Sequence, residues 1–168
     1  MKPYFHAAAR VLLFIGGNLL AGSALAFAAL NQGARVQDGA FFYWQRHFVD
    51  NIVATATLPG IALLVGGSLL LCLAEIRKKH LLLLTVSLAV AANSLLFILP
   101  ASHQASALAF QAARPVAVSA AFTAAKNTED RHGALNGVLL LVYLAVFFAR
   151  TGGLRRAVAK CGFQDLKS

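Results

Sequence analysis

Charged residues are scarce in this chain. They make up 12% of its 168 residues, whereas 59% of the residues are hydrophobic. This balance leaves too little polar surface to cover a water-soluble globule of this size. We therefore predict an integral membrane protein whose first partner is the lipid bilayer.

Cysteine is also scarce, and common catalytic motifs are missing. Cys72 lies inside an apolar run and Cys161 near the C-terminus, a spacing that fits neither a disulfide framework nor a metal site. The sequence has no Walker loop, His-Glu-x-x-His helix, Cys-x-x-Cys-His haem-attachment motif or serine nucleophile elbow. No charged residue lies at the centre of an apolar run, which disfavours an ion pump or channel.

Long apolar runs are what the chain has instead. A hydrocarbon core about 30 Å thick requires roughly 20 residues of helix at about 1.5 Å per residue. The sequence predicts an all-α bundle of four transmembrane helices, at about residues 9–30, 50–74, 80–100 and 128–150. These helices form one domain, 1–150, and a basic cytoplasmic tail follows at 151–168.

The distribution of the net charge of +9 is explained better by membrane topology than by nucleic-acid binding. We expect no nucleic-acid partner. Of the 15 Lys and Arg residues, ten lie in the N-terminus, the link between the second and third spans, and the tail. Under the positive-inside rule that side faces the cytoplasm. We predict a multi-pass protein of the bacterial inner membrane with both termini in the cytoplasm.

The links between the spans carry further local signals. Phe41–Trp44 is typical of an aromatic belt at the headgroup level, and Pro59 predicts a kink or a local loosening of the second span. The apolar segment 101–127 is expected to be partly helical and to lie at the membrane interface. Residues 127–130, Asn-Thr-Glu-Asp, have the composition of a helix start, so the fourth span is expected to begin near Thr128.

Two similar hexapeptides lead into the second and fourth spans. Residues 46–51 and 131–136 both read Arg-His-x-x-x-Asn. The first and third spans each carry one Asn, Asn18 and Asn93, whose simplest role is structural hydrogen bonding between helices. Together these matches suggest a duplicated two-helix hairpin, whose parallel repeats would bring both motifs to the same membrane face.

Within each motif the His and the Asn are four residues apart and share one helix face. His47 and His132 are therefore candidate metal ligands, either as the two axial ligands of a haem or, with His103 or a carboxylate, in a copper, iron or zinc site. The alternative is that these His and Arg residues simply lie among the headgroups. The predicted outward-facing pocket is lined by Trp44, His47, Asn51, His103, His132 and Asn136.

A few short motifs also indicate a family. With Gly16-Gly17, Thr57-Leu58-Pro59-Gly60 and Arg131-His132-Gly133 followed by Asn136, the chain resembles the broad group of small bacterial four-helix membrane proteins that includes anthrone-oxygenase-like proteins. The resemblance implies oxidation of an aromatic or quinone-like molecule. It would carry a site role over to His132 and Asn136.

The sequence thus favours a membrane protein with a His/Asn site for a metal, a haem or a quinone-like or aromatic small molecule. Whether it is an enzyme stays undecided, a membrane oxidoreductase being the class considered. One alternative is a structural or accessory subunit that packs against other membrane protein subunits, because small residues such as Gly16 and Gly22 allow close helix approach. A second alternative is a small-molecule transporter.

Overall fold

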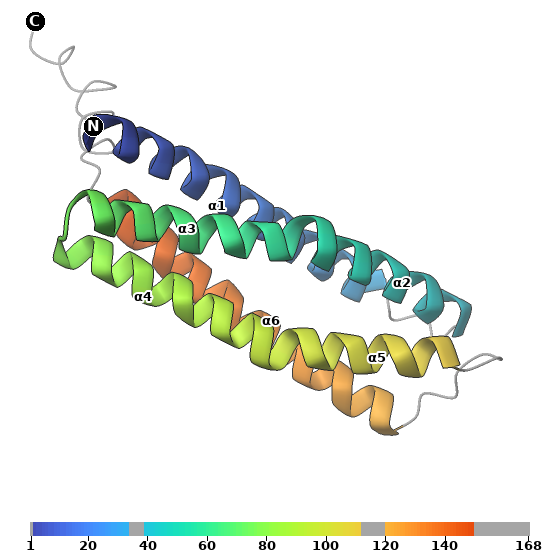
Figure 1. The fold of residues 1–168 in the computed structure, drawn as a ribbon. Helices are drawn as coiled ribbons and strands as arrows, with labels where there is room; N and C mark the ends of the chain where they lie inside the picture. Colours follow the sequence, from blue (N-terminus) through green and yellow to red (C-terminus); the bar gives the residue numbers. More distant parts are fainter. Residues whose placement is uncertain (1, 34–38, 112–119, 150–168) are drawn as a thin grey trace, which may run out of the picture.

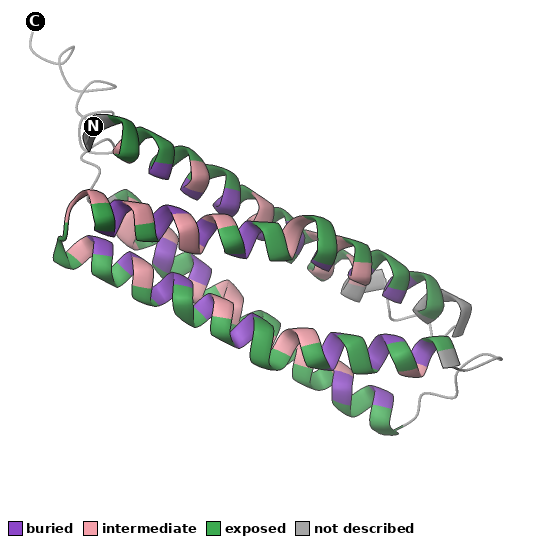
Figure 2. Ribbon diagram, in the orientation of Figure 1, coloured by how far each residue is buried: buried purple, intermediate pink, exposed green. Residues whose placement is uncertain are grey.

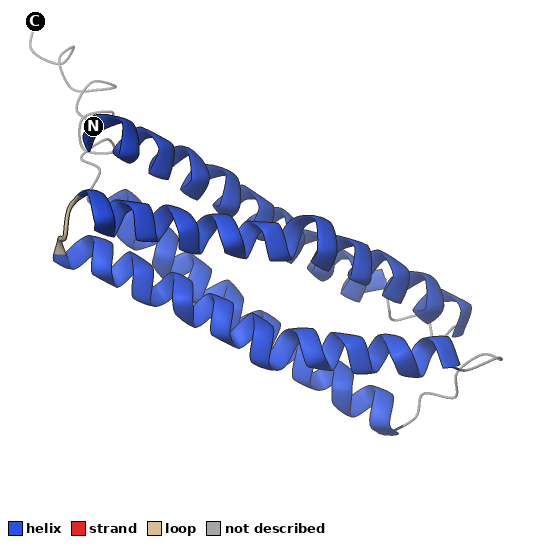
Figure 3. Ribbon diagram, in the orientation of Figure 1, coloured by secondary structure: helices blue, strands red, loops and turns tan. Residues whose placement is uncertain are grey.

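The computed structural model describes residues 2–33, 39–111 and 120–149, and within these ranges only residues 75–77 lie outside a helix (Figure 3). The helices are α1 (Lys2–Gly33), α2 (Gly39–Ile52), α3 (Leu58–Ala74), α4 (Lys78–Asn93), α5 (Leu99–Gln111) and α6 (Ala120–Ala149), with two π-helical segments, η1 (Val53–Thr57) and η2 (Ser94–Ile98). The predicted all-α fold class is confirmed.

The elements join into four long helices. Helix α2 runs through η1 into α3, and α4 runs through η2 into α5. All four are long and apolar enough to cross a bilayer, as predicted, over Tyr4–Leu30, Tyr43–Ala74, Lys78–Phe110 and Ala120–Phe148. At about 1.5 Å per residue each is longer than the roughly 30 Å of a hydrocarbon core.

Large apolar side chains cover the outside of the bundle. Leu25, Leu73 and Leu141 are about 70% exposed, on three different helices. Figure 2 shows exposed positions along the outward faces of the helices and buried positions facing the interior. A water-soluble protein rarely exposes so much contiguous apolar surface, whereas lipid tails accept it.

The helices are arranged as antiparallel neighbours. Helices α3 and α4 form a tight hairpin through residues 75–77, and the N-terminus lies at the same end of the bundle (Figure 1). The His80 ring bonds back to the Glu75 carbonyl across this turn, with Nδ1 2.7 Å from the oxygen. The main core is built from α1, α3, α4 and α6 and includes Leu13, Leu64, Val90, Leu140 and Tyr143.

Glycine brings α1 and α3 into backbone contact. A Cβ atom added to Gly16 would lie 2.9 Å from the Gly60 carbonyl oxygen and 2.9 Å from the Leu64 nitrogen. Both are main-chain atoms, which cannot move aside without separating the helices. The first helix is therefore held against α3 by small residues, as is common where apolar helices pack in lipid.

Each π-helical segment ends two residues before a proline. Pro59 follows η1, and Pro100 follows η2. Proline lacks an N–H, and its ring clashes with the carbonyl four residues earlier, so an α-helix cannot pass through it undisturbed. The wider π turn accommodates this locally, with the Leu58 N–H bonding to the Val53 oxygen and the Leu99 N–H to the Ser94 oxygen. The disturbance predicted at Pro59 is present as η1.

Two helix ends differ from the sequence predictions. The third long helix continues through Pro100 to Gln111, and α6 begins at Ala120 rather than near Thr128. The Thr128 hydroxyl bonds back to the Ala124 carbonyl at 3.0 Å, so it does not cap a helix start. The helical parts of 101–127 are continuations of the long helices, and Arg114-Pro115 lies outside the described residues.

Candidate functional site

A buried ion pair joins α2 to α6. Arg46 is 3% exposed and Glu129 12%, and the guanidinium grips the carboxylate with both terminal nitrogens: Nη1 lies 2.7 Å from Oε2 and Nη2 3.3 Å from Oε1. Arg46 is thus packed inside the bundle, whereas its depth relative to the headgroups stays a prediction. A charge buried in an apolar medium requires such a partner.

Helix α5 supplies the remaining partners of Arg46. Ser102 and Ser106, four residues apart on one face of α5, both receive its hydrogen bonds: Nη2 lies 2.7 Å from Ser102 Oγ, and Nε 3.1 Å from Ser106 Oγ. Ser106 in turn donates to Asp50 at 2.9 Å. One network of side chains therefore ties together α2, α5 and α6.

A second network connects α4 and α6. His132 Nδ1 and Asn93 Oδ1 are 2.6 Å apart, and because an amide oxygen only accepts, the ring nitrogen is the donor. Asn93 Nδ2 donates to Asn136 Oδ1 at 2.7 Å and to the His132 carbonyl at 2.9 Å. Asn136 donates onward to Ser94 at 2.6 Å, and the His132 ring stacks on Phe97 with 4.3 Å between centroids.

Replacing Asn93 with Ala is expected to lower the free energy of unfolding by about 1–2 kcal/mol, because interhelical hydrogen bonds in membranes contribute about 0.6 kcal/mol on average and three are lost here. The matched control is Asn18→Ala. Asn18 is exposed and bonds only within its own helix, to the Phe14 carbonyl at 2.7 Å, so a change within about 0.5 kcal/mol is expected. Unfolding of the two variants by titration with a denaturing detergent checks this. Equal losses of unfolding free energy would show that the interhelical hydrogen bonds of Asn93 do not stabilise the bundle.

The remaining predicted site residues lie on the surface. Trp44 is 63% exposed, and His47, Asn51 and His103 are also exposed. The His47 ring stacks against Phe110 at 4.5 Å between centroids and meets Tyr43 edge-on at 4.8 Å. This is a small aromatic cluster on the outer faces of α2 and α5.

The two Arg-His-x-x-x-Asn motifs thus differ in environment. In the first, Arg46 is buried while His47 and Asn51 are exposed. In the second, the Arg is exposed while His132 and Asn136 are half-buried. The two helices therefore present different faces of the motif to the bundle. The π-helical segments likewise occur in the second and third long helices rather than the second and fourth, so the duplicated hairpin stays a prediction.

This arrangement lends no support to a metal or haem. No contact joins His47 to His132, and nowhere in residues 2–33, 39–111 and 120–149 do three or more His, Cys, Asp or Glu side chains gather as metal ligands would. His132 has one ring nitrogen held by Asn93, as a ligating His often does.

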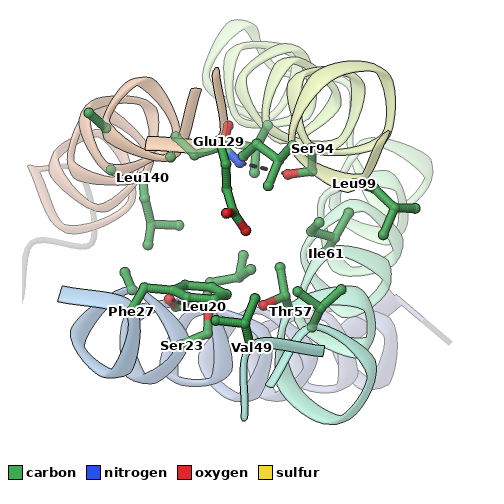
Figure 4. A pocket seen from close by; sticks show the side chains of 18 of the residues that line it. Leu20, Ser23, Phe27, Val49, Thr57, Ile61, Ser94, Leu99, Glu129 and Leu140 are labelled. Carbon is green, nitrogen blue, oxygen red and sulfur yellow. Dashed lines mark hydrogen bonds between the residues drawn. The ribbon is translucent and has the colours of Figure 1, made fainter. Parts of the chain in front are cut away.

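A cavity of about 320 Å³ lies between the four long helices, on the inner side of both networks. Arg46 and Glu129 reach it from one network, and Ser94 and Asn136 from the other. Figure 4 shows Glu129 extending toward its middle. Most of the remaining wall is apolar, and includes Leu20, Phe27, Val49, Ile61, Ile98 and Leu140.

Both π-helical segments contribute to the cavity wall. Val53 and Thr57 of η1 face it, as do Ser94 and Ile98 of η2. Of the six residues predicted to line a pocket, only Asn136 lines this one. Sequence reasoning missed Arg46 and Glu129 as a pair, although they carry opposite charges and each precedes an apolar run on the same predicted side of the membrane.

The chain matched none of the protein-family models, curated proteins or solved structures with which it was compared.

Proposed function

We propose that the cavity between the four helices binds an apolar small molecule of the aromatic or quinone-like class, taken from the surrounding lipid. The observation that carries this proposal is the placement of a buried ion pair in the wall of a mostly apolar cavity to which all four long helices contribute. Ligand sites of this kind are mostly apolar, with a few polar groups that fix the orientation of the ligand.

The size of the cavity supports a small ligand. Its volume of about 320 Å³ is near the lower end of the range of small-molecule sites, about 300–1,000 Å³. The lining also supports an aromatic ligand, because the Phe27 ring can stack against an aromatic ring and the surrounding aliphatic side chains can pack against its faces. The π-helical segments are a further support, since such segments frequently occur at functional sites.

Two glycines keep part of the cavity open. Gly133 and Gly137 both line it, and a Cβ atom added to either would meet no atom within 4 Å. A larger side chain at these positions would therefore extend into the cavity without displacing the backbone of another helix. Occupation of the cavity is testable without disturbing either polar network.

Replacing Gly137 with Phe is expected to reduce the binding of a quinone probe, menadione, at least about tenfold, because the new ring occupies the ligand's volume. The control is Gly22→Phe. Gly22 is exposed, does not line the cavity and has open space around its Cβ direction. Menadione retained by protein in lipid nanodiscs, relative to empty nanodiscs, measures the effect. If the Gly137 variant binds as the control does, the ligand does not occupy this cavity.

Charge supports an orientation for the site. Arg10 of α1 lies toward the same end of the bundle as the turn that carries Arg77, Lys78 and Lys79 (Figure 1). Under the positive-inside rule this end belongs in the cytoplasm of a multi-pass inner-membrane protein. Arg46, in α2, then lies toward the outer face, so the ligand's polar group is oriented toward the periplasmic side.

A further inference from the structure

The carboxylate of Glu129 is the more buried of the two carboxylates in the cavity wall, the other being that of Asp130. The Glu129 carboxylate extends toward the middle of the cavity, opposite the apolar side chains of Leu20 and Ile61 (Figure 4). Each of its oxygens accepts one hydrogen bond from Arg46. An ionised carboxylate has about four lone-pair sites, so roughly two stay available to a ligand.

Most hydroxyl hydrogens in the wall are already used. Ser23 donates to the Leu20 carbonyl at 2.9 Å, and Thr57 donates to the Ile52 carbonyl at 3.5 Å. Their oxygens remain as acceptors. Arg46 has directed four of its five N–H groups to Glu129, Ser102 and Ser106. The wall therefore offers more acceptors than donors. It holds two carboxylates, Glu129 and Asp130. Asp130 is 43% exposed and pairs with Lys126 at 3.2 Å, so the buried charged acceptor is Glu129.

From this imbalance we infer that the ligand carries a hydroxyl group that donates to Glu129, as a phenol or quinol does. The inference rests on the proposed binding function and specifies its ligand. A hydroxyl suits the site because it donates to the carboxylate and accepts from the remaining Arg46 N–H at the same time. A carbonyl or ether oxygen can only accept, so it leaves Glu129 without a new partner.

Charged ligands suit the site less well. Arg46 already neutralises Glu129 at 2.7 Å. A buried cation near the carboxylate would be repelled by the adjacent guanidinium, and a buried anion near the guanidinium would be repelled by the adjacent carboxylate. Either charge would also lose its hydration on entering an apolar cavity. A neutral donor makes a charge-assisted hydrogen bond without that cost, and such bonds are about twice as strong as neutral ones.

The test compares two probes of similar size, 1-naphthol and 1-methoxynaphthalene, in the second of which a methyl group replaces the hydroxyl hydrogen. Binding to the protein in nanodiscs is measured against empty nanodiscs. We expect 1-naphthol to bind at least about tenfold more tightly, since a hydrogen bond to a charged group is worth that factor or more. Equal binding of the two probes overturns the hydroxyl inference but leaves the cavity as a ligand site. If neither probe binds, the proposed function itself is overturned.

A paired variant assigns the preference to Glu129. In Arg46→Gln combined with Glu129→Gln no charge is left unpaired, and the preference for 1-naphthol is expected to fall below about threefold. A preference that persists in the folded variant shows that another group binds the hydroxyl. Thermal unfolding establishes that the variant is folded.

A second measurement tests, in the protein without substitutions, whether the ligand hydroxyl bonds to Glu129. The chain contains two Glu residues, Glu75 in the turn and Glu129 in the cavity. In protein labelled with ¹³C at Glu carboxyls, 1-naphthol is expected to shift one infrared carboxylate band, and 1-methoxynaphthalene to shift neither. Unshifted bands with bound 1-naphthol contradict a bond to Glu129.

Discussion

Replacing Arg46 with Ala is expected to lower the free energy of unfolding by about 3–5 kcal/mol, the largest effect of any single change considered for this protein. The substitution leaves Glu129, 12% exposed, without its counter-ion, and it removes the donors that reach Ser102 and Ser106. Because α2, α5 and α6 meet at this guanidinium, the loss should appear in global unfolding of the protein in detergent, followed by circular dichroism.

The paired substitution Arg46→Met with Glu129→Leu separates the cost of an unpaired charge from the value of the pair. Apolar replacements of a buried ion pair are often neutral or stabilising, so the double variant should be more stable than Arg46→Ala. The two serines can then bond to carbonyls in their own helix. A double variant as unstable as the single one would mean that the ion pair itself, rather than the avoidance of an unpaired charge, stabilises the bundle.

Replacing Gly16 with Ala is expected to cost about 2 kcal/mol or more. The added methyl group would lie 2.9 Å from two main-chain atoms of α3, so α1 must move away along its length. Thermal unfolding in the same detergent measures the loss. Separation of α1 also widens the cavity, to which this helix contributes Leu20 and Phe27.

Two neighbouring glycines provide graded comparisons for Gly16. At Gly17 a Cβ meets no atom within 4 Å, so Gly17→Ala is expected to be neutral or stabilising by up to about 1 kcal/mol through helix propensity. At Gly67 the two nearest atoms, at 2.7 and 2.8 Å, belong to the Leu13 side chain, and the nearest main-chain atom, the Ala9 carbonyl oxygen, is 3.1 Å away. An intermediate loss is therefore expected. If Gly16→Ala and Gly17→Ala behave alike, backbone contact between α1 and α3 does not limit stability.

The extent of the helices was only partly predictable from hydropathy. The runs starting near residues 9 and 80 are recognisable because an apolar stretch is uniform in composition. Helices α5 and α6, however, extend well beyond the apolar runs, through Pro100 and upstream of Thr128. Capping residues predict a helix start only where the preceding chain is not helical, and the Ala-rich residues before Thr128 continue the helix instead.

The candidate site was less predictable than the fold. Periodicity places His132 and Asn136 on one face of α6, and the structure brings both together with Asn93, a residue that the sequence suggested only as a structural one. The same reasoning applied to His47 and Asn51 predicts a shared face but not which way that face turns. In the bundle it turns outward, and Arg46 faces the interior in its place.

The amino-acid sequence by itself determined that the apolar runs form helices suited to a lipid bilayer. In a medium without water, the backbone amides of an apolar run must bond to carbonyls of the same run, as they do in a helix. The rotation of each helix about its axis was decided only by packing: Gly16 must meet the α3 backbone, and one guanidinium must reach a carboxylate 83 residues away in the chain. Those long-range contacts, which no local pattern encodes, place Arg46 and Glu129 in the wall of a cavity and His47 outside it.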